Sequence, residues 1–260
     1  MLSQDRQTQI MAQIHANHSV SVLEASRVLG VSTETVRRDL VELERRGLLR
    51  RVHGGAVSLT PPPVPEQPHT ARVTTNAAAK RTIGMLAAQL ITVERILFID
   101  AGTTAQQLAR AISRSYTGTV ITASLLVATE LMRSDRAKVL VAPGMIQPHE
   151  PTLCGSVTNE FLHRYHYDLA FISCSGMSAD AGVTDYQLDY ATLSRTVIDN
   201  ADRSVLLADS SKDGRVAHAV VCGWDRVSDV VTERELSDET ANALAAAGTH
   251  VVCPRPRRGR

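Results

Sequence analysis

The sequence has 260 residues, which is long enough for one small and one larger domain. With 43% hydrophobic and 21% charged residues, the composition is that of a globular protein and excludes a disordered or fibrous chain. The formal net charge of +1 excludes a globally basic polyanion binder and leaves room for a local basic patch. Aromatic residues make up only 3%, which disfavours binding of single-stranded nucleic acid by base stacking.

Cysteine usage and the length of apolar runs set the expected compartment. The four cysteines, Cys154, Cys174, Cys222 and Cys253, form no C-x-x-C pair and no tight spacing with histidine. We therefore expect no disulfide framework, no metal site, no cofactor and a reducing compartment. Because no run of about 18 apolar residues occurs and the first residues lack the layout of a signal peptide, we expect a cytoplasmic protein.

The start of the chain predicts three helices separated by short turns. Apolar residues at helical spacing indicate helices over residues 7–15, over 23–29, and after Ser32. Gly30 ends the second helix, and Ser32 offers an N-cap to the third, whose buried face holds Val36, Leu40 and Leu43. Beyond them, Gly54-Gly55 can make a tight turn between two short strands, a small wing. Residues 1–57 are expected to form a winged helix-turn-helix domain.

Basic residues gather on the third helix and the wing. Residues 37 to 53 hold six arginines against three acidic residues, a patch that the overall charge hides. In a helix-turn-helix the second helix enters the major groove, so its first turns face base edges or phosphates. The residues expected to contact DNA are Thr33, Thr35, Arg37, Arg38, Arg50, Arg51 and His53.

Two other interpretations of this patch remain open. Arg38 can simply pair with Glu34 and Glu42 on a solvated helix, because residues four apart are neighbours on a helix surface. Small three-helix units with short turns also dock other proteins.

Residues 58–76 predict a linker. They contain five of the ten prolines and no apolar periodicity. Proline fixes φ and lacks a backbone donor, so this stretch is expected to be extended and to separate residues 1–57 from a larger domain over 77–253. The Pro/Arg-rich residues 254–260 are expected to fray.

The larger domain alternates short apolar strands with helices. We expect strands at 96–100, 120–122, 139–142, 169–173, 205–209, 230–232 and 250–252. Continuous apolar strands separated by helices of about 10 to 15 residues are typical of a mostly parallel sheet covered on both faces. The fold class is therefore α/β behind a winged helix-turn-helix, and ligands are expected at the carboxyl ends of the strands.

Small, hydroxyl-bearing and charged residues collect at those strand ends. Gly102, Thr103 and Thr104 follow Asp100 and open a helix, whose free N–H groups and dipole attract an anion. Lys212 is the only lysine in the last third of the chain and is a candidate phosphate partner. The predicted ligand-binding residues are Asp100, Gly102, Thr103, Thr104, Thr122, Gly176, Gly182, Thr184 and Lys212. An ordinary strand-to-helix turn and a surface lysine are the alternatives.

The stretch from Val31 to Ala56, VSTETVRRDLVELERRGLLRRVHGGA, resembles the signature of the DeoR family of bacterial transcriptional repressors. The later segments are similar to that family's effector domain, which is related to ribose-5-phosphate isomerase and glucosamine-6-phosphate deaminase. The resemblance implies a repressor of a carbohydrate-utilisation operon that binds a double-stranded DNA operator as a dimer or tetramer. It also implies an effector that is a phosphorylated sugar or sugar alcohol. Ala123, Pro143 and Ser194 depart from the family pattern, which leaves the identity of the effector open.

A second class of function also has to be weighed. A sugar-phosphate isomerase or deaminase with an appended domain would need a positioned base, and Asp100, Asp185, Asp189 and Asp209 supply carboxylates. The DNA-binding unit has no purpose in such an enzyme, so we expect a regulator with no catalytic residues.

Overall fold

The structure, a computed structural model, describes residues 3–17, 19–52, 54–57, 68–92, 95–112, 115–134, 136–147 and 150–254. Its internal contacts divide the chain into two compact units, Met1–Pro65 and Glu66–Arg260. Within the described part of the chain, no helix is long and apolar enough to cross a membrane.

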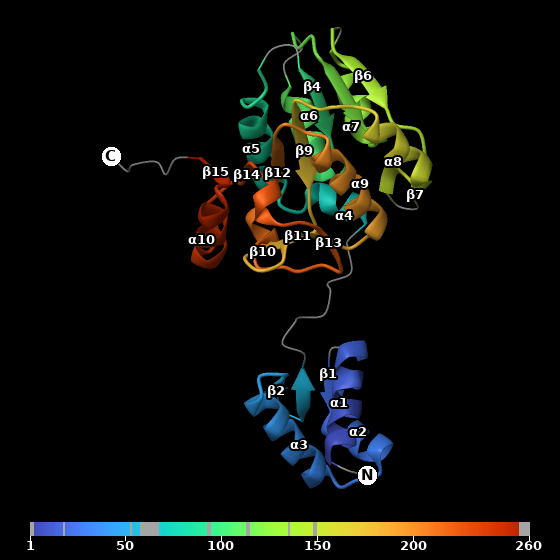
Figure 1. Cartoon of the computed structure of the whole chain (residues 1–260), viewed down its shortest axis with the longest axis vertical. Coiled ribbons are helices and arrows are strands. Elements are labelled where there is room, and N and C mark those ends of the chain that lie inside the picture. Colours follow the sequence, from blue (N-terminus) through green and yellow to red (C-terminus); the bar gives the residue numbers. More distant parts are fainter. Residues whose placement is uncertain are drawn as a thin grey trace, which may run out of the picture. The chain divides into compact units, whose positions relative to one another are not determined.

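The first unit is a winged helix-turn-helix, as predicted (Figure 1). Its elements are α1 (Ser3–Asn17), β1 (Ser19–Ser21), α2 (Val22–Leu29), α3 (Thr33–Arg45), β2 (Arg50–Val52) and β3 (Gly55–Val57). The three strands form one antiparallel sheet in the order β1-β3-β2. The sequence did not predict β1, because three residues are too few to show an alternating pattern.

Local signals position α3 in this unit. Gly30 ends α2 with a left-handed φ of 65°, and the Ser32 hydroxyl accepts a hydrogen bond from the Thr35 N–H at 3.2 Å. The predicted stripe of Val36, Leu40 and Leu43 is buried in the core of the unit. The opposite face of α3 is left at the surface.

An ion pair between Arg6 and Asp39 connects α1 to α3. Asp39 is 4% exposed, and its carboxylate is held by two nitrogens of Arg6, with 2.9 Å between Nη2 and Oδ1. Removing one partner of such a buried pair leaves a charge uncompensated, so the pair fixes how α3 lies on α1.

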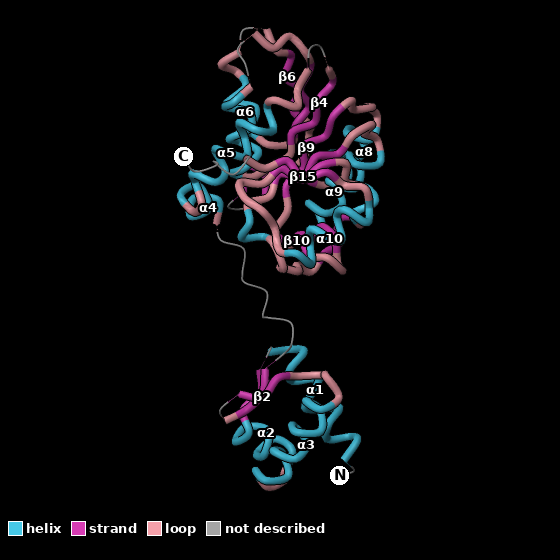
Figure 2. The backbone as a smooth tube through the Cα atoms, turned by 90° about the vertical axis from the view of Figure 1, so that its left-hand side faces the viewer, coloured by secondary structure: helices cyan, strands magenta, loops and turns pink. Residues whose placement is uncertain are grey.

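The second unit is built on a seven-stranded parallel sheet in the order β15-β14-β12-β9-β4-β5-β6 (Figure 2). The strands are β4 (Ile96–Ile99), β5 (Thr119–Thr122), β6 (Lys138–Val141), β9 (Leu169–Ser173), β12 (Ser204–Leu207), β14 (Asp229–Val231) and β15 (His250–Val252). The parallel sheet expected from the sequence is confirmed, with strand bounds within one or two residues.

Helices cover both faces of this sheet, and the side chains of each strand alternate between two cores. Helices α5 (Ala77–Ala88), α6 (Thr103–Ala111) and α7 (Leu125–Leu131) pack with Leu97 and Ile99 of β4. Helices α8 (Ser156–His163) and α9 (Leu188–Asp199) share the opposite core with Phe98. Helix α10 (Asp238–Ala247) joins that side through Leu244. Burial on both faces explains why the strands read as continuous apolar runs.

Two small antiparallel additions were not predicted from the sequence. Strands β7 (Met145–Gln147) and β8 (Glu150–Cys154) pair with each other, and β10 (Gly176–Ser178), β11 (Gly182–Asp185) and β13 (Ala219–Cys222) form a three-stranded sheet. Two short 3-10 turns, Ser210–Lys212 and Trp224–Arg226, complete the unit.

The predicted linker is wrong in its last part. Residues His69–Thr74 form a helix, α4, in the second unit. The linker prediction depended on prolines, and the last of them, Pro68, stands at the N-cap of α4, where proline does not interrupt a helix. Residues 58–67 of the predicted extended stretch lie outside the described residues, as do His53 and residues 255–260 of the tail predicted over 254–260.

Candidate functional site

The first candidate site is the exposed face of α3. Arg37, Arg38 and Val41 are exposed on it, while Thr33 and Thr35 are half-buried at its start. One depression in the surface is lined by Glu34, Arg37, Arg38, Val41, Glu42 and Arg51. The structure therefore brings the predicted residues of the helix together with Arg51 of the wing.

The arginines of this face differ in how they are paired. Glu34 lies 3.6 Å from Arg37, and Glu42 accepts a hydrogen bond from Arg45 at 2.8 Å. Arg38 makes no hydrogen bond or ion pair with any described residue. The alternative in which Arg38 is bound by both glutamates of its own helix is not what the structure shows, so its guanidinium is available to a partner.

The wing is fastened to α3 through Arg51. Its backbone N–H donates to Oε1 of Glu44 at 2.8 Å, and its side-chain Nε donates to Oε2 at 2.6 Å. These hydrogen bonds lower the pKa of the Glu44 carboxyl. Arg50, the neighbouring residue of β2, is exposed and has no partner among the described residues. Arg50 is therefore the freer of the two wing arginines.

The second candidate site is a cavity of about 40 Å³ at the carboxyl ends of β4 and β9. Asp100 and Gly102 come from the turn after β4, and Ser173 ends β9. The full lining is Arg72, Asp100, Ala101, Gly102, Glu150, Ser173, Cys174, Ser175, Asp185, Tyr190 and Ser194. A cavity of this size holds about one or two water molecules, so a larger ligand requires some of these side chains to move.

Asp100 is held in this cavity by backbone donors. Its Oδ2 accepts a hydrogen bond from the Ser173 N–H at 2.9 Å, and its Oδ1 accepts one from the Ala101 N–H at 2.7 Å. Burial, together with the charge of Asp185, raises the pKa of Asp100 to about 7 against the effect of the two N–H donors. Asp100 can therefore exist with or without its proton near neutral pH.

Helix α6 begins directly beside Asp100. Gly102 has a φ of 102°, a conformation that favours glycine, and its carbonyl accepts the first helical hydrogen bond, from the Gln106 N–H at 3.0 Å. The N–H groups of Thr103, Thr104 and Ala105 have no acceptor among the described residues. These donors and the positive end of the helix dipole make this turn attractive to an anion.

Cationic side chains lie near the same strand ends. Lys80 is 6% exposed, and its ammonium donates to the Arg72 carbonyl at 2.7 Å. Burial lowers the pKa of Lys80 to about 8; Asp209 opposes that shift, and the charges of Lys212 and Arg72 add to it. The charge of Lys212 also acts on Cys174, which lines the cavity.

Seven of the nine predicted ligand residues do not line the cavity: Thr103, Thr104, Thr122, Gly176, Gly182, Thr184 and Lys212. Four of these seven have other contacts. The hydroxyl of Thr184 donates to the Gly176 carbonyl at 3.1 Å and accepts from the Ala217 N–H at 2.9 Å, and that of Thr122 accepts from the Ser124 N–H at 3.0 Å. Both threonines are 0% exposed. A Cβ on Gly176 would lie 2.5 Å from the Arg215 carbonyl oxygen, and one on Gly182 2.4 Å from that of Cys222. Their roles in this structure are packing and local hydrogen bonding.

The predicted ligand residues omit nine of the eleven lining residues, among them Arg72 and Glu150, whose side chains form an ion pair and a hydrogen bond. Arg72 lies in the stretch that was taken for linker, and Glu150 lies on an unpredicted hairpin strand. No local signal could have connected them. Ser194, one of the departures from the family pattern, does line the cavity, and its hydroxyl donates to Asp100 at 3.5 Å.

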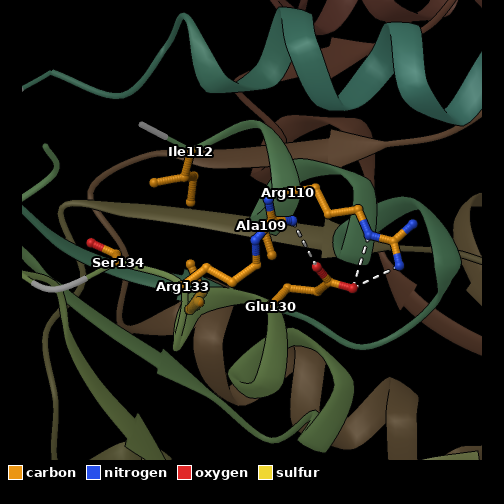
Figure 3. Close-up of a pocket in the computed structure, with 7 residues that line it drawn as sticks. Ala109, Arg110, Ile112, Glu130, Arg133 and Ser134 are labelled. Atoms are coloured by element: carbon orange, nitrogen blue, oxygen red, sulfur yellow. Dashed lines mark hydrogen bonds and ion pairs between the residues drawn. The ribbon is translucent and has the colours of Figure 1, made fainter. Parts of the chain in front are cut away.

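A separate hollow lies between α6 and α7 (Figure 3). Glu130 accepts hydrogen bonds from Arg110 at 2.8 and 2.6 Å and from Gln106 at 3.2 Å. Glu130 also lies 3.7 Å from Arg133, so one carboxylate is shared by the two arginines of this hollow. Among the described residues, no group of three or more His, Cys, Asp or Glu side chains could hold a metal ion.

Comparison with known proteins finds two family models in this chain. The DeoR-like helix-turn-helix domain matches residues 6–61, and the DeoR C terminal sensor domain matches residues 75–234. The HTH-type transcriptional regulator GlpR of Haloferax volcanii is 31% identical over 97% of this chain and 98% of its own length. The regulator GolR of Listeria innocua is 30% identical over 95% and 97%. The L-fucose operon activator of Haemophilus influenzae is 28% identical over 88% and 91%.

Among solved structures, ribose 5-phosphate isomerase A of Methanocaldococcus jannaschii matches with a TM-score of 0.40 and 18% identity. The match covers 53% of this chain and 55% of the isomerase chain.

Proposed function

Because the chain belongs to the DeoR family of transcriptional regulators, we propose that it represses a carbohydrate-utilisation operon and responds to a phosphorylated sugar or sugar alcohol. In this proposal the first unit binds the operator and the second binds the effector. A regulator of this kind works where its DNA lies, so we expect it in the cytoplasm.

The observation that supports DNA binding most directly is the exposed guanidinium of Arg38 beside Arg37 and Arg51. Arginine bonds guanine bidentately in the major groove or holds a phosphate. Since Arg38 forms no ion pair with a described residue, it can bind a DNA base without first breaking one. We assign base contacts to Arg38, and phosphate contacts to Thr33, Thr35, Arg37, Arg50, Arg51 and His53.

The effector proposal depends on the turn from Asp100 to Thr104. Free N–H groups at the start of α6 suit a phosphate, and Lys212 and Arg72 supply positive charge nearby. The hydroxyls of a sugar or sugar alcohol could donate to Asp100 and Asp185. The cavity must open for such a ligand, because about 40 Å³ is too small for it.

A mobility-shift assay on the promoter of the protein's own gene tests both operator binding and the response to an effector. We expect a shifted band that weakens with salt, as phosphate contacts require, and that responds to some members of a panel of sugar phosphates. A band that forms equally on unrelated DNA would contradict operator recognition. A band that ignores every sugar phosphate would contradict the effector class.

A second candidate function rests on Asp100. A half-buried carboxyl with a pKa of about 7, raised in part by Asp185, is suited to general acid–base catalysis. Incubation with ribose 5-phosphate and with glucosamine 6-phosphate distinguishes the two functions. We expect both to be recovered unchanged, and turnover of either would favour the enzyme.

A further inference from the structure

One side of the ligand cavity is lined by an ion pair between elements that are far apart in sequence. Arg72 is on α4 and Glu150 is at the start of β8, 78 residues later. Their side chains are only 18% and 10% exposed, and both line the cavity. The pair is therefore largely removed from water and belongs to the surface that a ligand in this cavity would contact.

The charges of the cavity lining show why the Arg72–Glu150 pair affects the binding of an anion. The lining holds three carboxylates, those of Asp100, Glu150 and Asp185, and one guanidinium, that of Arg72. An anion that entered this lining unchanged would meet net negative charge. A guanidinium stays charged at all ordinary pH values, and its planar fork matches a phosphate as well as a carboxylate. Arg72 can thus exchange one anion for another.

We propose that Glu150 is a built-in competitor for the ligand's anionic group, so that the Arg72–Glu150 pair is an anion-selective gate. This inference rests on the proposed function, in which the second unit binds a phosphorylated ligand. A phosphate with two negative charges displaces Glu150 from Arg72 and opens the cavity. A neutral sugar has no anionic group to compete with Glu150 for the guanidinium, so the Arg72–Glu150 pair stays intact.

Closure by Glu150 has a measurable effect on affinity. When only a fraction of the protein is competent to bind, the apparent dissociation constant rises by the inverse of that fraction. Removing the negative charge at position 150 should remove this competition. We expect Glu150→Gln to bind a phosphorylated ligand about ten times more tightly than the wild type.

Opening the gate also has to loosen α4. This helix has six residues, and two of the contacts that connect it to the body of the unit come from Arg72: its side chain pairs with Glu150, and its carbonyl accepts from the Lys80 ammonium at 2.7 Å. A ligand that takes over the guanidinium removes the first connection. The amides of Ala71, Arg72 and Thr75, which are bonded within α4, should then exchange faster with solvent.

The test is calorimetric titration of the full chain with inorganic phosphate, ribose 5-phosphate and ribose. The wild type is compared with Glu150→Gln and with Glu160→Gln, a matched control whose glutamate pairs with Arg164 on the surface of α8. We expect tighter binding of both phosphates in Glu150→Gln, unchanged binding in Glu160→Gln, and no gain for ribose in either variant.

Unchanged or weaker phosphate binding in Glu150→Gln, while the wild type binds, overturns the gate and leaves the proposed function standing. Absence of phosphate binding in all three proteins overturns both. Hydrogen exchange of α4 in the wild type gives a test that does not depend on how a variant folds. Faster exchange with ribose 5-phosphate supports displacement of Glu150, and equal or slower exchange contradicts it.

Discussion

At the scale of single residues, Arg38 shows how pairing decides what an exposed side chain can do. Arg37 and Arg45 have glutamate partners within one turn, whereas Arg38 has none among the described residues. A surface ion pair is worth little, yet it must still be given up before the arginine binds something else. Of the three helix arginines, Arg38 therefore binds DNA at the lowest cost.

We predict that Arg38→Ala weakens operator binding by about 1 to 3 kcal/mol and relaxes the preference at one base position. The matched control is Arg45→Ala, at the last turn of α3, where the arginine is paired with Glu42. Titrations on the operator, on single-base variants and on random DNA provide the measurement. An equal loss on operator and random DNA would mean that Arg38 contacts a phosphate.

Asp100 makes stability depend on pH. Its pKa is about 7 in the folded chain against an ordinary 3.8, so the folded chain keeps a proton that the unfolded chain releases. The stabilisation is complete below the ordinary pKa and is lost as the pH rises through 7. Between pH 5 and pH 8 the loss amounts to about 2 to 3 kcal/mol in the free energy of unfolding.

We predict that Asp100→Asn flattens this pH dependence. Denaturant unfolding of the second unit between pH 5 and pH 8 should show a smaller fall in the variant than in the wild type. Asp180→Asn, a change at an exposed position in the turn after β10, is the control and should follow the wild type. Parallel curves for Asp100→Asn and the wild type would show that Asp100 is ionised throughout this range.

At the scale of elements, the wing depends on Arg51. The bonds from Arg51 to Glu44 hold β2 against the last turns of α3, so this arginine both shapes the wing and adds to its charge. We predict that Arg51→Ala weakens binding to operator and random DNA alike and reduces the salt slope by about 1.

Arg50→Ala is the control for Arg51→Ala, because it removes an equal charge without touching Glu44. It should reduce the slope equally and leave the thermal stability of the first unit unchanged. A sequence-dependent loss in Arg51→Ala would contradict a phosphate contact.

Local sequence signals predicted the elements that are defined locally. The parallel strands are buried on both faces, so each appears in the sequence as a continuous apolar run. Helix α3 was predicted from the Ser32 N-cap and from the buried stripe between Val36 and Leu43. Strands β1 and β7 have only three residues each, too few for a period to show. Helix α4 has six residues and follows a proline cluster, and the prolines led us to predict a linker there.

The candidate ligand site was predictable only where it lies on strand ends. Asp100 and Gly102 follow β4 and do line the cavity. Thr184 was predicted in the same way, but its hydroxyl is hydrogen-bonded to the backbone of Gly176 and Ala217. The sequence alone does not reveal these hydrogen bonds. The Arg72–Glu150 pair joins two elements that only the tertiary fold brings together.

At the scale of the whole molecule, a single recognition helix covers only one half-site, whereas working repressors bind two. We predict that the protein is at least a dimer and that the second unit supplies the interface. That unit exposes apolar side chains, among them Met132 at 78%, Met145 at 73% and Ile146 at 61%. Light scattering at micromolar concentration should give at least twice the mass of one chain. A particle with the mass of one chain, with and without DNA, would contradict this.

The last prediction links ligand binding in the second unit to DNA binding in the first. Lys212 follows β12 and places its charge near Lys80 and Cys174. A charge-assisted contact to phosphate is worth on the order of 1.5 to 3 kcal/mol, so Lys212→Ala should raise the effector concentration needed for half of the change in operator affinity about tenfold or more. Lys138→Ala on the edge strand β6 is the control, since that lysine is exposed and lies away from the cavity lining. Thr104→Val should shift the same curve by less, because it removes a neutral hydroxyl. If the half-effect concentration is the same in Lys212→Ala and the wild type, the phosphate is held elsewhere.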